Sequence, residues 1–395
     1  MINVSKVYEV EFNNSIKYCC DYVRNGDKKT LWFEISKESK PFVSMDICDP
    51  FFVILTLFAI EVGENIEFSV PVSRKLLFGF KEYLMDALSS MDLKYKLIEV
   101  NANPSDITFD NSPFTATAMS MGVDSFYSLY SNIHTEFPIT HLTLFNAGTF
   151  GSKDEEGAKK LFEQMVNQVS YVSEVLGYPL IWVDTNINEV LTISFLRSHS
   201  FRHLACALLL QKGIGTYFYS SGHKIEDFKL DISDSANYDL LSSYSLSSNN
   251  MNLNVSGLTT TRVHKTISLT NFKPTESYLN VCLITTDYDS VEYKSGSYKN
   301  CSKCHKCIRT MLTLDVIGKL NNYKDIFDID LYKKNKDKHM SEMIYHFFRS
   351  KDPFSVEILD EMKKRNVKLN VNVYINLIKR CFKSIFSKIR LNKDV

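Results

Sequence analysis

The first part of the chain alternates apolar and polar positions and then changes to longer apolar runs. Strict alternation, typical of half-exposed strands, covers Ser5 to about Tyr18 and Thr30–Ser36. The sequence Asn25-Gly26-Asp27 between them favours a hairpin turn. The other elements predicted here are helices over residues 48–62 and 74–92 and a strand over residues 94–101. We therefore expect an N-terminal α+β domain over residues 1–110.

Beyond residue 110, short apolar runs alternate with longer amphipathic segments. The predicted strands cover residues 115–119, 141–145, 180–183 and 216–220, and the predicted helices cover residues 124–131, 155–176 and 200–212. Strands and helices that alternate at this spacing indicate a parallel sheet with right-handed crossovers. The sequence therefore predicts an α/β domain with a doubly wound parallel sheet over residues 111–320.

Two stretches have a different character. Residues 233–254 are rich in Ser and Asn, which is typical of a loop that covers a site or becomes ordered with a ligand. After Thr310 the pattern is helical, so we expect a helical C-terminal extension over residues 321–395. From residue 361 onward this tail is basic, with ten Lys or Arg residues against Glu361 and Asp394.

The tail also carries apolar residues at helical spacing. One helical face collects Ile375, Ile378, Phe382, Ile385, Phe386 and Ile389. Packing of this face on the protein's own domain is one interpretation. Contact with an acidic partner, nucleic acid or a membrane surface is the other.

Composition narrows the class of protein. The chain has 395 residues, of which 44% are hydrophobic and 23% charged, and this excludes a mainly disordered protein. Its 46 basic and 46 acidic residues give no net charge, so a nucleic-acid partner would need a local basic patch. The longest apolar stretch, Phe51–Ile60, is about half the length that crosses a bilayer. With no secretory signal at the N-terminus, we expect a cytoplasmic protein without an integral membrane segment.

A turn of mostly small residues, Ser120-Met121-Gly122-Val123-Asp124-Ser125, joins a predicted strand to a predicted helix. Free backbone N–H groups and the positive end of a helix dipole suit a phosphate group at such a turn. Ser120 and Ser125 add hydroxyl donors, and Asp124 can approach a magnesium ion that bridges phosphates. A plain helix N-cap is the alternative interpretation.

Three of the nine cysteines form the pattern C-x2-C-x2-C at Cys301, Cys304 and Cys307. Two-residue spacings let thiolates converge on one tetrahedral ion. For the fourth ligand we favour Cys282, in a predicted strand over residues 278–284, over His305 inside the cluster. Zinc and a [4Fe–4S] cluster both suit such a set. In a reducing compartment this spacing predicts a metal site and not disulfides.

The turn resembles the Ser-Gly-Gly-x-Asp-Ser signature of the PP-loop ATP pyrophosphatase superfamily. Ser120, Gly122, Asp124 and Ser125 are in register, and Met121 stands where that superfamily usually has its first glycine. A cysteine followed at a distance by C-x2-C-x2-C is similar to the 7-cyano-7-deazaguanine synthase family within it. The resemblance covers residues 114–315. The long segment before it, the helical extension and the long interval from Cys282 to Cys301 indicate a divergent relative.

The resemblance implies an adenine nucleotide alpha hydrolase-like fold with ATP, Mg²⁺ and Zn²⁺ as cofactors. It implies a ligase that forms a C–N bond. The enzyme would adenylate a carboxylate of a deazaguanine-type small molecule, release pyrophosphate, and pass the acyl group to ammonia. Asp124 and Ser125 are then the expected catalytic residues, and the zinc ligands are Cys282, Cys301, Cys304 and Cys307.

The resemblance also implies where ATP binds. The expected contacts are Ser120, Met121, Gly122, Val123, Asp124 and Ser125, with Phe145 and Asn146 near the adenine. Cations near the phosphates are expected among Arg197, Arg202, Arg262 and Lys265. Ser220, Ser221 and Gly222 would face the same edge of the sheet.

Two other functions stay open. One is an RNA-modifying PP-loop enzyme. The other is a nucleotide-binding scaffold in a defence or biosynthetic gene cluster, in which Met121 marks a degenerate loop. Further partners also stay open: a second copy of the chain in a homodimer, or another protein on the N-terminal domain or the basic C-terminal helix.

Overall fold

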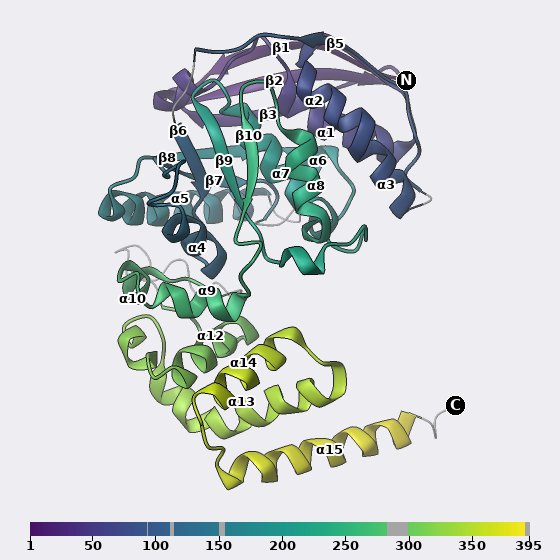
Figure 1. Ribbon diagram of the computed structural model, residues 1–395. Helices are drawn as coiled ribbons and strands as arrows, with labels where there is room; N and C mark the ends of the chain where they lie inside the picture. Colours follow the sequence, from purple (N-terminus) through teal and green to yellow (C-terminus); the bar gives the residue numbers. More distant parts are fainter. Residues whose placement is uncertain (93, 111–113, 150–154, 283–298, 392–395) are drawn as a thin grey trace. The chain divides into compact units, whose positions relative to one another are not determined.

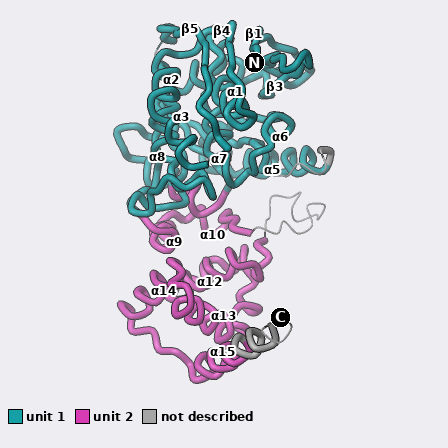
Figure 2. The backbone as a smooth tube through the Cα atoms, turned by 90° about the vertical axis from the view of Figure 1, so that its right-hand side faces the viewer, with its two compact units in different colours: residues 1–120, 128–259 teal, residues 121–127, 260–395 magenta. Residues whose placement is uncertain are grey.

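The computed structural model describes residues 1–92, 94–110, 114–149, 155–282 and 299–391 (Figure 1). The chain forms two compact units (Figure 2). The first contains residues 1–120 and 128–259, and the second contains residues 121–127 and 260–395. The domain boundaries predicted at residues 110 and 320 each fall inside a unit, and they remain predictions about which parts fold independently.

The first unit is built on one sheet of ten strands in the order β10-β9-β6-β7-β8-β3-β2-β1-β4-β5. The strands are β1 (Ile2–Glu11), β2 (Ser15–Arg24), β3 (Asp27–Ser36), β4 (Ile66–Ser73), β5 (Val100–Ser105), β6 (Phe114–Ala118), β7 (His141–Asn146), β8 (Leu180–Thr185), β9 (Ile214–Ser220) and β10 (Asn252–Ser256). Helices flank this sheet, as an α/β fold requires (Figure 1).

The sheet has a parallel half from β10 to β8. β6 lies between β7 and β9, so the strand order reverses there. Ligands of open α/β sheets bind beyond the carboxyl ends of the strands at such a reversal. The loop that follows β6 is therefore the first place to look for a site, as the sequence predicts.

The N-terminal strands continue the same sheet. β3 pairs antiparallel with β8, with Phe33 opposite Thr185 and Ile35 opposite Val183. Beyond β3 the hairpin strands β2 and β1 are antiparallel, and β1, β4 and β5 are parallel. The Thr185 hydroxyl also donates to the carbonyl oxygen of Trp32, at 2.6 Å. Elements predicted as an α+β domain and elements predicted as an α/β domain thus share one sheet.

The helices of the first unit are η1 (Lys37–Phe42), α1 (Asp49–Val62), α2 (Arg74–Gly79), η2 (Phe80–Leu84), α3 (Met85–Met91), α5 (Glu155–Leu176), α6 (Ile187–Val190), α7 (Phe195–Leu209), η3 (Ile225–Asp227), η4 (Ser235–Tyr238) and α8 (Asp239–Leu246). α4 (Val123–Ser131) belongs partly to each unit. The second unit contains α9 (Arg262–Leu269), α10 (Pro274–Tyr278), α12 (His305–Val316), η5 (Leu320–Tyr323), α13 (Ile329–Ser350), α14 (Pro353–Lys364) and α15 (Val371–Leu391).

Helix α1 explains the longest apolar run of the sequence. Pro50 occupies its first turn, where no N–H is needed, and Gly63 ends it with a φ of 69°. Every residue from Asp49 to Ile60 is buried. A helix that is apolar on all sides lies within a core, and α1 packs against α7 there.

Several sequence predictions need correction. The alternation from Ser5 to Tyr18 belongs to two strands, because Phe12 donates to the Ser15 carbonyl oxygen and closes a tight turn between β1 and β2. The strand predicted over residues 94–101 begins only at Val100, and β4 was not predicted. Residues 233–254 are not a loop throughout, since they contain α8 and the start of the edge strand β10.

The remaining predicted elements are confirmed in type. β6, β7, β8 and β9 and the helices α4 and α5 lie where the pattern placed them, and the chain after Thr310 is helical. The helix predicted over residues 200–212 is α7 (Phe195–Leu209), and the short helix α6 was not predicted. The strand predicted over residues 278–284 is absent as far as Cys282, and its last two positions lie outside the described residues. Within the part of the chain described, no helix is both long and apolar enough to span a membrane.

Candidate functional site

The loop after β6 has an unusual backbone at Met121. Its φ is 59°, in the left-handed region that favours glycine. This conformation costs a residue with a Cβ about 1–2 kcal/mol. The Met121 side chain is 1% exposed, so burial of its apolar atoms offsets that strain. Methionine therefore stands in the conformation that the glycine of the resembled signature would adopt without strain.

The loop is held to the segment that carries the first cysteine of the cluster. The Asn280 backbone N–H donates to the carbonyl oxygen of Met121 at 2.8 Å. The Asn280 side-chain oxygen in turn accepts from the backbone N–H of Cys282 at 3.3 Å. At the N-terminus of α4, the Ser125 hydroxyl donates to the Gly122 carbonyl oxygen at 3.0 Å.

Asp124, in the first turn of α4, pairs with two cations of α9. Its Oδ2 is 2.6 Å from Arg262 Nη2, and its Oδ1 is 3.1 Å from Lys265 Nζ. Arg262 is half exposed and Lys265 is buried. Arg262 and Lys265 are three positions apart, so one face of α9 presents both cations. α9 is itself capped by Thr261, whose hydroxyl oxygen accepts from the His264 N–H at 3.2 Å.

The charge state of Asp124 follows from these contacts. Burial raises the pKa of its carboxyl, but Arg262 and Lys265 more than compensate and hold that pKa below its usual value. Asp124 is therefore ionised at neutral pH. Two cations on one carboxylate leave a local excess of positive charge.

Lys306 adds to this positive charge. It lies in the first turn of α12, and its ammonium group interacts electrostatically with both Asp124 and Arg262. Burial and the repulsion of Arg262 lower the pKa of Lys306. Sequence reasoning missed this residue. The only available signal was its position within the cysteine motif, between Cys304 and Cys307.

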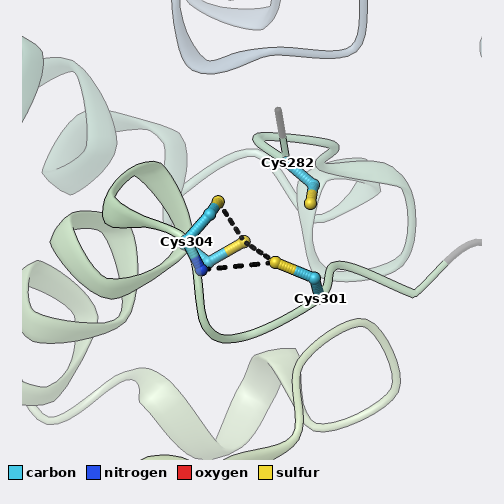
Figure 3. Close-up of side chains that lie close together, drawn as sticks. Cys282, Cys301 and Cys304 are labelled. Atoms are coloured by element: carbon cyan, nitrogen blue, oxygen red, sulfur yellow. Dashed lines mark hydrogen bonds between the residues drawn. The ribbon is translucent and has the colours of Figure 1, made fainter. Parts of the chain in front are cut away.

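The four predicted cysteines are brought together. The sulfur atoms of Cys282, Cys301, Cys304 and Cys307 all lie within 4.8 Å of one another. Figure 3 shows the sulfur atoms of Cys282, Cys301 and Cys304 directed toward a common space. Cys307 Sγ is 3.8 Å from Cys301 Sγ and 3.4 Å from Cys304 Sγ. His305, the competing fourth ligand, is not part of this group.

A group of four thiols at this spacing can hold a metal ion. Burial and the three neighbouring thiols raise the pKa of Cys307, so this thiol resists deprotonation in the absence of a metal ion. A cation at the centre reverses this balance, because metal binding releases the thiol protons. The chemistry of the donor set therefore fits a metal ion.

The other residues predicted at the ATP site lie in the first unit. Phe145 is buried and stacks on Tyr217 with ring centroids 6.0 Å apart. The Asn146 amide donates to Asp184 Oδ1 at 2.7 Å, and burial raises the pKa of Asp184.

Two predicted phosphate ligands have other partners. Arg197 pairs with Asp92 at 2.7 Å. Arg202 is 1% exposed and donates to Ser198 Oγ, Asn188 Oδ1 and the carbonyl oxygens of Ala147 and Ile193. Its burial lowers the pKa of the guanidinium to about 10. Arg202 thus ties the end of β7 to α7 as a structural residue.

A polar cluster lies at the end of β9, where sequence reasoning named Ser221 but missed Asp234 and Asp239. The Ser221 hydroxyl donates to Asp239 Oδ2 at 2.9 Å, and burial raises the pKa of Asp239 to about 6. Close by, the two ring nitrogens of His199 form hydrogen bonds of 2.9 Å, Nδ1 with the Tyr219 hydroxyl and Nε2 with Asp234 Oδ1. Asp234 and Asp239 both lie within residues 233–254, the Ser-rich and Asn-rich segment that was predicted to be a loop.

Comparison with known proteins adds no assignment. Neither the family models, nor the curated proteins, nor the solved structures contain a match to this chain.

Proposed function

We propose that this protein is an ATP-dependent ligase that adenylates a carboxylate, with residues 120–125 at the phosphates. The observation that carries the proposal is the placement of Arg262 and Lys265 on Asp124 at the N-terminus of α4. Their excess positive charge suits an anion with several oxygens, and Lys306 adds a third cation. The position of the loop after β6, where the strand order reverses, supports the same assignment.

In the proposed reaction an oxygen of the substrate carboxylate attacks the α-phosphorus of ATP. The bond from that phosphorus to the bridging oxygen breaks, and pyrophosphate leaves. Ammonia then attacks the acyl carbon, AMP leaves, and the nitrogen loses a proton. Arg262 and Lys265 bind phosphate oxygens and stabilise the developing charge. Asp124 orients these two cations, while Mg²⁺, when bound, would supply further charge neutralisation.

The substrate class follows from the sequence resemblance. We propose a carboxylate on a deazaguanine-type heterocycle, as in the 7-cyano-7-deazaguanine synthase family.

For the metal we propose zinc in a structural role. Four thiolates around one tetrahedral zinc, with bonds of about 2.3 Å, stand about 3.8 Å apart. The observed spacings of 3.4 and 3.8 Å suit that geometry. A four-iron cluster would hold its thiolates farther apart, because they bind outside a cube of iron and sulfur atoms. Zinc at this position would fix the first turn of α12 and with it Lys306.

Nucleotide binding tests the reaction class. Isothermal titration with a non-hydrolysable ATP analogue and Mg²⁺ should show binding by the native protein. Lys306→Gln should weaken it about tenfold, the loss of one charge-assisted hydrogen bond. Lys303→Gln is the matched control, because Lys303 is an exposed lysine of the same cysteine motif, as Lys306 is, and the change removes the same charge. Absence of ATP binding, or equal effects of the two variants, would contradict the proposal.

Turnover tests the substrate separately. The protein, ATP, Mg²⁺, ammonium and 7-carboxy-7-deazaguanine should yield pyrophosphate and AMP in equal amounts, and Arg262→Gln should abolish both. ATP binding without pyrophosphate release would remove this substrate. Turnover only with RNA would favour the RNA-modifying alternative, and ATP binding without turnover on either would favour the scaffold.

A further inference from the structure

Helix α15 exposes an apolar face. The side chains on it are exposed to 69% at Val371, 52% at Tyr374, 44% at Ile375, 56% at Ile378 and 57% at Phe382. Their spacing of three or four positions places them on one side of the helix. Large apolar side chains that gather at this spacing mark an interaction surface, whereas single exposed ones need no explanation.

This face is not the one that holds α15 in the second unit. α15 packs against α13 through the opposite side, where Val373 is buried. On that side Arg380 pairs with Glu342 of α13 at 3.0 Å. Helical geometry of about 100° per residue places Val373 and Arg380 across the helix axis from Ile378 and Phe382. The interpretation that the tail packs its apolar face on its own domain is therefore wrong for Ile375, Ile378 and Phe382, the predicted positions whose side chains are described.

The charge of α15 distinguishes between possible occupants. Its sequence has five basic residues, Lys379, Arg380, Lys383, Lys388 and Arg390, and no acidic one. Lys379 and Lys383 are exposed and flank the apolar face. A second copy of the helix would bring the same positive charges together and be repelled. Nucleic acid would satisfy the charges but leave the apolar side chains in water.

We propose that α15 binds the surface of a membrane that contains anionic lipids. The helix lies in the plane of the interface, with Tyr374, Ile378 and Phe382 among the acyl chains. Lys379 and Lys383 contact the headgroups. Amphipathic helices with an apolar face and a basic flank bind in this way, through buried apolar area and attraction to anionic lipid. The proposal is independent of the proposed ligase activity.

Co-sedimentation with vesicles tests the proposal. The purified 395-residue chain should sediment with vesicles of phosphatidylcholine and phosphatidylserine, and much less with phosphatidylcholine alone. The double variant Ile378→Ser, Phe382→Ser should lower the partition coefficient at least tenfold, because it removes two large apolar side chains. The double variant Lys379→Gln, Lys383→Gln should lower the partition coefficient about fivefold per lysine. Added salt should also lower the partition coefficient.

Phe78→Ser is the matched control, because Phe78 of α2 is 56% exposed and lies in the first unit. It should leave vesicle binding unchanged. Circular dichroism should show unaltered helix content and melting temperature in all variants, since the substituted side chains are exposed. Equal binding to neutral and anionic vesicles, or no binding to either, would overturn the proposal. Self-association that Ile378→Ser, Phe382→Ser abolishes, without vesicle binding, would also overturn it and assign the face to a second copy.

Discussion

The Asn280 backbone N–H donates to the carbonyl oxygen of Met121, and this bond joins the loop after β6 to the segment that leads into the cysteine cluster. Because the Asn280 side chain also accepts from the Cys282 N–H, one residue contacts both sequence motifs. The two motifs that define the family resemblance are therefore physically coupled within the second unit. Substitution of a metal ligand should therefore also affect the loop after β6.

Metal removal should test this coupling. Cys301→Ser should abolish binding of the proposed zinc ion, lower the free energy of unfolding by several kcal/mol, and weaken ATP binding. Metal content by mass spectrometry, thermal unfolding and titration with the ATP analogue measure the three effects. Cys381→Ser is the control, because Cys381 is an exposed cysteine of α15 outside the cluster. Full metal content in Cys301→Ser would contradict the assignment of this ligand.

Substitution of Met121 should reveal the strain in its backbone. Both Met121→Ala and Met121→Gly remove a buried side chain, but only glycine relieves the positive φ. Glycine should therefore be the more stable variant by about 1 kcal/mol, as measured by urea unfolding. At Lys159, which is exposed on α5, the alanine variant should be more stable than the glycine variant, because alanine is the better helix former. A more stable alanine variant at 121 would mean that the left-handed conformation is wrong.

The buried carboxyl of Asp239 should make stability depend on pH. Its pKa of about 6 lies above the ordinary value of 3.8, so the folded state binds the proton more tightly than the unfolded state. Stability should fall as pH rises from about 4 to 6, by about 3 kcal/mol in total, and then level off.

Asp239→Asn keeps the acceptor for Ser221 and removes this dependence. The variant should therefore be more stable than the native protein at pH 8. Glu226→Gln, at an exposed position, should change stability by less than about 0.5 kcal/mol. Parallel pH profiles for the native protein and Asp239→Asn would show that Asp239 is not the titrating group.

Arg202 should prove to be structural. Arg202→Lys leaves buried acceptors at Asn188, Ala147 or Ile193 without a donor, which should cost about 2–3 kcal/mol of stability. Affinity for ATP should not change. Arg74→Lys, in an exposed ion pair with Asp106, should cost less than about 1 kcal/mol. Weaker ATP binding without loss of stability would restore Arg202 as a phosphate ligand.

Local patterns were sufficient for some of these features. The apolar run that became β7 is buried on both faces, and the run that became β8 is buried on one face and partly buried on the other, so the apolar composition of each run identifies it as a strand. The two-residue spacings of Cys301, Cys304 and Cys307 let the three sulfur atoms converge within one short segment, as the structure shows. Both predictions depend on residues close in sequence, and both are confirmed.

Other features depend on distant parts of the chain. The pairing of β3 with β8 joins Phe33 to Thr185, residues far apart in the sequence, and no local pattern encodes it. β10 is a short edge strand of alternating Asn and apolar residues, which its Ser-rich and Asn-rich surroundings conceal. Arg202 and Arg262 have the same side chain. Only the fold determines that one is buried among carbonyl oxygens and the other lies on Asp124.

The junction of β3 with β8 has a consequence during synthesis. The hairpin of β2 and β3 emerges from the ribosome long before β8, and at 5–20 residues per second the wait is about 8–30 s. During that time the edge of β3 that β8 will cover has unpaired backbone groups and can pair with other nascent chains. Efficient folding in the cell should therefore depend on a chaperone that shields this edge until residue 185 has been added.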